Sequence, residues 1–203
     1  DQAGNLVQTV PPKGVQPLGV GSFNQDGSWK GHNPNHSLQT RYQYNSLNQV
    51  IAQSTPETRQ ENTDNRSRFT YDKLGRIRFS QDPKQAQSND YSYTKYDDLG
   101  RIVEVGQIDG LTLSNGETLE GKAAETNFPE ASMYTLSDVI QTFYNEKVDG
   151  TVAQNNLRNR VAQTENESII TRYSYDIHGN VEHLYHELKE TSIPFQMRNF
   201  EIS

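Results

Sequence analysis

The chain has 203 residues, a net charge of −7 and no cysteine, which excludes disulfide bonds, thiolate metal sites and a cysteine nucleophile. Its 19 basic residues form no cluster, so we expect no nucleic-acid partner, and no apolar run reaches the roughly 18 residues of a membrane span. The hydrophobic fraction is 32% when Tyr is counted as hydrophobic. Counting the 14 Gly in place of the 11 Tyr gives about 34%, whereas the same set of residues makes up about 45 to 50% of a typical globular domain. This shortfall predicts either a loop-rich chain or, as we favour, a chain whose core is completed by neighbouring repeats.

The chain opens on a turn motif without its preceding tyrosine, Asp1–Val7. A return strand is expected over Leu6–Val10, ending at Pro11-Pro12, because proline cannot donate a hydrogen bond to a ladder. Residues 11–37 are rich in Pro and Gly and predict an inserted loop. Trp29 either pins this loop onto a sheet, which we favour, or stacks on a ligand.

Four later stretches share one pattern, with six residues from a tyrosine to an aliphatic residue. An Asp or Asn follows the tyrosine, and a Gly or Asn stands three positions after this Asp or Asn. A side-chain oxygen of Asp can accept a hydrogen bond from the backbone N–H of the residue two positions later. Gly tolerates the positive φ with which the chain enters the next strand through a bulge. The pattern therefore predicts consecutive β-hairpins on type I turns. Its residues are Tyr44, Asn45, Asn48 and Val50; Tyr71, Asp72, Gly75, Arg76 and Ile77; Tyr96, Asp97, Gly100, Arg101 and Ile102; and Tyr175, Asp176, Gly179, Asn180 and Val181.

Alternating aromatic and branched residues around these turns predict the strand pairs. Phe69 and Tyr71 are expected to face Ile77 and Phe79. In the last hairpin, Tyr173 and Tyr175 are likewise expected opposite Val181 and His183. The strand tyrosines favour cross-strand packing over stacking on sugars.

The rhythm breaks over residues 108–138, which we interpret as a second insertion. Pro129–Met133 can start one short helix there, and Val139–Tyr144 is expected to be a strand. Tyr144-Asn145, followed by Asn159–Val161, is interpreted as a copy of the motif with an expanded turn. The tail over Phe195–Ile202 is either one more strand or disordered.

The repeated Tyr-Asp-x-x-Gly-Arg-aliphatic unit resembles the YD repeats of the RHS family. This resemblance implies an all-β fold of consecutive antiparallel hairpins with little helix, forming a segment of a larger spiralling β-sheet shell. Residues 1–203 would then be one repeat region with two insertions and no separate second domain. Proteins of this family are large secreted or surface bacterial proteins whose shells often enclose a C-terminal toxin.

No residue set predicts catalysis, a cofactor or a metal. The adjacent acids Asp97 and Asp98 lie in a turn, where the two side chains point apart, so they do not suit a glycosidase. His183 and His186 differ by an odd number of positions on an expected strand, and with His178 they make a poor zinc site. We expect no enzymatic activity.

The sequence therefore predicts a structural wall segment of a secreted or cell-surface protein, which encapsulates or presents an effector. Expected partners are other repeats of the same protein, the effector and secretion machinery. The alternative is a carbohydrate-binding or adhesion module that uses Tyr and Trp29 to contact glycans. The low apolar content and the start within a motif also predict that the chain is a fragment with unpaired sheet edges.

Overall fold

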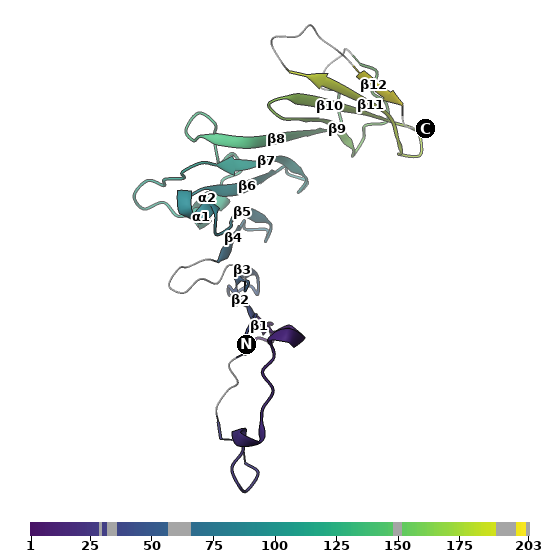
Figure 1. Ribbon diagram of the computed structural model, residues 1–203. Helices are drawn as coiled ribbons and strands as arrows, with labels where there is room; N and C mark the ends of the chain where they lie inside the picture. The colour runs from purple at the N-terminus through teal and green to yellow at the C-terminus, as the bar shows by residue number, and fades with distance from the viewer. Residues whose placement is uncertain (29, 32–35, 57–65, 148–151, 190–197, 202–203) are drawn as a thin grey trace. The chain divides into compact units, whose positions relative to one another are not determined.

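Figure 1 shows the computed structural model, which describes residues 1–28, 30–31, 36–56, 66–147, 152–189 and 198–201. The chain divides into two compact units, residues 1–88 and 89–203. Within each unit, strands that are consecutive in the sequence are antiparallel neighbours. The predicted all-β fold of consecutive hairpins, with little helix, is confirmed.

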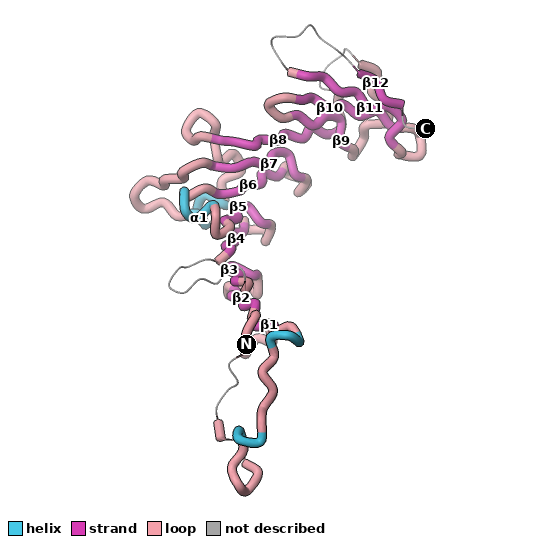
Figure 2. The backbone as a smooth tube through the Cα atoms, in the orientation of Figure 1, coloured by secondary structure: helices cyan, strands magenta, loops and turns pink. Residues whose placement is uncertain are grey.

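The first unit is a sheet in the order β1 to β5 with short helical turns outside it (Figure 2). Its strands are β1 (Gln8–Thr9), β2 (Thr40–Tyr44), β3 (Val50–Ser54), β4 (Ser67–Tyr71) and β5 (Ile77–Gln81). Two 3-10 turns, Pro12–Gly14 and Val20–Ser22, lie in the connection from β1 to β2, and α1 (Gln85–Ser88) follows β5.

The second unit continues the same up-and-down order from β6 to β12. Its strands are β6 (Tyr91–Tyr96), β7 (Ile102–Ile108), β8 (Leu136–Tyr144), β9 (Val161–Glu165), β10 (Ile169–Tyr175), β11 (Val181–Leu188) and β12 (Arg198–Glu201). One helix, α2 (Leu119–Ala123), lies in the connection from β7 to β8.

Buried apolar side chains are spread through the second unit, from Tyr93 to Tyr175. Leu157, Ala162 and Tyr175 form one buried cluster, with Tyr173 and Val181 packed against it. The side chain of Gln154 bonds the backbone of two strands beside this cluster. Its Nε2 donates to the carbonyls of Ala162 (2.7 Å) and Tyr173 (3.0 Å).

The predicted helix at Pro129–Met133 is wrong. Residues 130–134 make only a turn, with N–H groups of Met133 and Tyr134 bonded to the carbonyl of Glu130. The helix of this insertion is α2, where the Thr118 hydroxyl accepts the N–H of Gly121 (3.1 Å) and caps the first turn. The short helix α1 was not predicted.

Two predicted strand details also need correction. The strand expected over Leu6–Val10 is reduced to Gln8–Thr9, which pairs with β2. The bulges shift the register, so Phe79 lies opposite Thr70 rather than Phe69.

The last hairpin shows the same shift, with His183 opposite Ser174 and Leu184 opposite Tyr173. The pairs next to the turns, Tyr71 with Ile77 and Tyr175 with Val181, are as predicted. In the tail, only residues 198–201 are described, and they form β12.

Candidate functional site

Each repeat turn is held by a side-chain oxygen of the residue that opens it. Asp72 Oδ1 accepts the backbone N–H groups of Leu74 (2.9 Å) and Arg76 (2.9 Å). The backbone adds a bond from the N–H of Gly75 to the carbonyl of Asp72 (3.0 Å). Asp and Asn suit this position because their short side chains reach their own turn. The same oxygen-to-backbone bonds occur at Asp1, Asn45, Asp97 and Asp176.

The residue three positions after the opening residue has a positive φ. The angle is 79° at Gly75, 80° at Gly100, 97° at Gly179 and 61° at Asn48. The register of the strand pair shifts next to the motif tyrosine in each of these four copies. The turn residues therefore adopt the bulged geometry that the motif predicts.

In two copies the opening Asp also pairs with an arginine four positions later. Arg76 Nε lies 2.7 Å from Asp72 Oδ2, and Arg101 Nη2 lies 2.7 Å from Asp97 Oδ2. Burial acts to raise the pKa of both carboxyls, but hydrogen bonds to the arginines and their charge outweigh it. The pKa of each Asp is therefore lowered, and each turn is favoured with its carboxylate ionised.

Two further copies keep this geometry with other residues. In the expanded turn, Asn145 Oδ1 accepts the N–H of Asn159 (2.9 Å), and the N–H of Asn145 bonds the carbonyl of Arg160 (3.2 Å). In the last copy Asn180 donates to Asp176 Oδ2 (2.9 Å), which lowers the pKa of Asp176. An amide thus replaces the guanidinium without loss of the turn.

The motif tyrosine connects each of four copies to the copy before it, a role that the sequence analysis missed. The hydroxyl donates to the backbone carbonyl of the aliphatic residue that ends the preceding motif. The fixed spacing between the tyrosine and the aliphatic residue was the only sequence signal for this bond. The spacing does not indicate which group the tyrosine hydroxyl bonds. The bonds run from Tyr44 to Leu6 (2.8 Å), Tyr71 to Val50 (2.7 Å), Tyr144 to Ile102 (2.9 Å) and Tyr175 to Val161 (2.9 Å).

Consecutive turns within each unit also touch directly, through the residue that directly precedes the aliphatic residue of the motif. In the second unit this residue is an arginine whose guanidinium lies over one face of the tyrosine ring of the next copy. We call this row of turns, with its tyrosine bonds, the turn ladder. Its contacts are Asn5 Nδ2 to Asn48 Oδ1 (2.8 Å), Gln49 Nε2 to the Gly75 carbonyl (3.3 Å), Arg101 Nη1 to Asn145 Oδ1 (3.2 Å), Arg101 over Tyr144 (4.3 Å) and Arg160 over Tyr175 (5.3 Å).

A polar cluster on the second unit joins three strands. Glu104 of β7 accepts hydrogen bonds from the hydroxyl of Tyr93 on β6 (2.9 Å) and from Nε2 of Gln141 on β8 (2.8 Å). Lys95 Nζ lies 2.7 Å from the same carboxylate. Burial acts to raise the pKa of Glu104, but these three partners lower it overall. A cavity of about 370 Å³ lies beside the cluster, with Phe143 in its lining.

The groups of this cluster satisfy one another, so they hold strands together. Burial and the nearby Glu104 carboxylate raise the pKa of the Tyr93 hydroxyl, which keeps it a hydrogen-bond donor. The sequence analysis did not single out this cluster, because its members come from three strands and follow no local motif.

The remaining candidates are not brought together. Asp98 is exposed, whereas the carboxylate of Asp97 is used inside its turn. His183 and His186 pair with Ser174 and Thr171, on opposite faces of the sheet. Within the described ranges, no group of acids and histidines could hold a metal, and no helix is long and apolar enough to cross a membrane. Trp29 lies outside the described residues.

No protein-family model and no curated protein matches the chain. Among solved structures, it is similar to one titled "Crystal Structure of TcdB2-TccC3-TEV", with a TM-score of 0.39 and 13% sequence identity. The similarity covers 81% of this chain and 8% of the other, so this chain spans less than a tenth of the structure it matches.

Proposed function

We propose that the chain is a wall segment of an RHS-type β shell, in which consecutive hairpins form the wall. The turn ladder is the observation that carries this proposal. In four copies the tyrosine hydroxyl bonds the copy before it, as Tyr71 bonds the Val50 carbonyl at 2.7 Å. Because each copy completes its predecessor, the same contacts can continue for any number of hairpins, as in other repeat architectures.

The wall has a structural role in this proposal, without catalysis. The first strand, β1, and the last strand, β12, stand at the two ends of the strand order. Edge strands of this kind pair readily with further strands. Neighbouring repeats would cover them. The shell would enclose or present an effector in a secreted or surface-exposed bacterial protein, in keeping with the motif resemblance.

The test uses the complete polypeptide that carries this segment, studied by electron microscopy and limited proteolysis. We expect a hollow particle whose interior polypeptide resists a protease until the wall is opened. A solid globular particle, or an extended rod with no protected interior, would contradict the proposal.

A further inference from the structure

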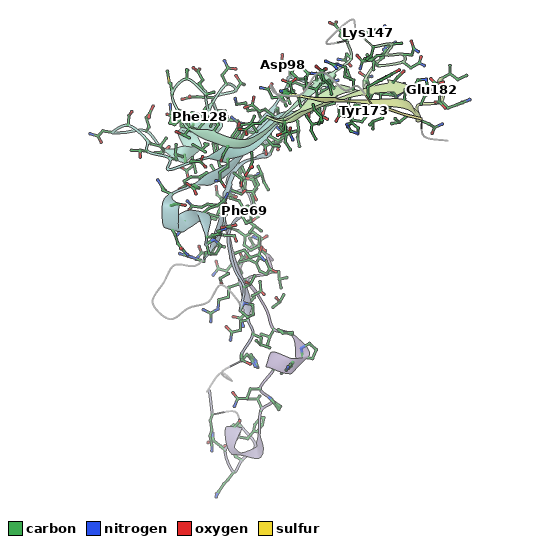
Figure 3. The ribbon with its side chains drawn as sticks, turned by 45° about the horizontal axis from the view of Figure 1, so that its top comes forward. Phe69, Asp98, Phe128, Lys147, Tyr173 and Glu182 are labelled. Carbon is green, nitrogen blue, oxygen red and sulfur yellow. The ribbon has the colours of Figure 1, made fainter. Side chains whose placement is uncertain are left out.

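The connection between β7 and β8 forms a cavity of about 400 Å³ that is lined only by residues between 122 and 134. Its wall is well packed: the ring of Phe128, labelled in Figure 3, is 4% exposed and meets the ring of Tyr134 edge-on at 5.0 Å. Lys122 lies over the Phe128 ring and pairs with the Glu117 carboxylate at 2.7 Å. The positive charge in the lining is therefore already neutralised within the insertion.

Other groups in the lining are not engaged. Within the described part of the chain, the carboxylate of Glu130, the amide of Asn127 and the hydroxyl of Tyr134 make no side-chain hydrogen bond. Met133 is 73% exposed, so its apolar side chain is open to contact. The N–H of Tyr134 bonds the carbonyl of Glu130, four positions earlier, so one turn brings these two residues of the lining close together.

The chain uses a carboxylate and a tyrosine ring elsewhere to hold a guanidinium. Arg101 pairs with Asp97 at 2.7 Å while lying 4.3 Å over the ring of Tyr144. A planar guanidinium suits both partners, because it donates two parallel N–H groups to a carboxylate and stacks on an aromatic face. The insertion cavity offers Glu130 and Tyr134 in its lining without an arginine among its lining residues.

We propose that this cavity binds an arginine side chain of another polypeptide. Glu130 accepts the guanidinium N–H groups, Tyr134 stacks on its plane, and Met133 covers the methylene stem. The net charge of −7 attracts a basic partner segment. Glu130 and Asn127 are solvent-exposed and Tyr134 is half-buried, so a side chain can enter while its backbone stays outside. The site is separate from the turn ladder and does not depend on the proposed wall function.

The experiment measures binding of the full 203-residue chain to surfaces carrying an immobilised Gly-Arg-Gly peptide or its citrulline analogue. Citrulline keeps the shape of arginine and removes its charge. We expect binding to the arginine surface and at least tenfold weaker binding to citrulline, because hydrogen bonds to charged groups contribute about 1.5 to 3 kcal/mol. Equal binding to both surfaces, or no binding to either, would overturn the proposal.

Two variants locate the site. Glu130→Gln should weaken arginine binding about tenfold, whereas Glu120→Gln should leave it unchanged. Glu120 is an exposed acid of the same insertion outside the cavity lining, so both variants change the net charge equally. Far-ultraviolet circular dichroism verifies that both fold. An equal loss in both variants would mean non-specific attraction, and so would crosslinks from a photoreactive arginine peptide that map outside residues 122–134.

Discussion

At the residue scale, each turn depends on one side-chain oxygen and one residue with positive φ. The oxygen of Asp72 or Asn45 takes the N–H groups that a tight turn leaves without a strand partner. Glycine or asparagine then allows the chain to enter the next strand through the bulge. Leu74 and Leu99, between these positions, are 77% and 72% exposed and contribute little to the fold.

We expect Gly100→Ala to destabilise the chain more than Asp98→Ala. Gly100 has a φ of 80°, where an added Cβ costs about 1 kcal/mol or more. Asp98 is exposed in the same turn, and such surface changes usually stay within about 0.5 kcal/mol. Urea midpoints of the two variants measure the difference. Equal midpoints would count against the bulged turn as a source of stability.

Tyr71→Phe tests the bond between consecutive copies. Removing the hydroxyl leaves the Val50 carbonyl without that donor, and we expect a loss of about 1 kcal/mol in the free energy of unfolding. The matched control is Tyr91→Phe, since the Tyr91 hydroxyl makes no hydrogen bond with the described residues. If both variants lose equal stability in urea, the hydroxyl bond does not link the copies.

At the element scale, the hairpins follow from local chemistry, which explains why they could be predicted. Asp97 and Gly100 fix a turn within a few residues, and flanking Tyr96 and Ile102 pair across it. The bulges displaced every pairing beyond the turn by one residue. A period-two pattern predicts strands, but it does not show where a bulge adds a residue to one strand. The partner of Phe79 was therefore predicted as Phe69, whereas it is Thr70.

The helical segments could not be predicted for a different reason. α1 and α2 are four and five residues long, too short to show helical periodicity. α2 depends on the cap from Thr118, whereas Pro129 is buried beside a simple turn. The Glu104 cluster also escaped prediction, because only the strand register brings β6, β7 and β8 into one polar contact.

Glu104 makes stability depend on pH. Its pKa is lowered in the folded chain, so its contribution is present above the unfolded value of about 4.3 and is lost as pH falls through the folded pKa. Glu104→Gln removes this ionisation. We expect the difference in urea midpoint between wild type and variant to shrink as pH falls from 7 towards 3, and a difference independent of pH would contradict the assignment.

At the scale of the whole molecule, the two compact units are built in the same way, from consecutive antiparallel hairpins. Each is an up-and-down sheet whose turns are tied to one another, and the second unit contains the apolar cluster of Leu157, Ala162 and Tyr175. The low apolar content was evident from composition. The turn ladder was not, because it consists of hydrogen bonds between residues 14 to 44 positions apart in the sequence.

Hydrogen exchange on residues 1–203, alone and within a longer form that carries neighbouring repeats, tests most directly whether the chain is a wall segment. We expect the isolated chain to be oligomeric or poorly protected at its outermost strands β1 and β12, because these end the strand order. Protection of these strands should rise in the longer form. A monodisperse monomer by light scattering, with all strands equally well protected and unchanged in the longer form, would contradict the account.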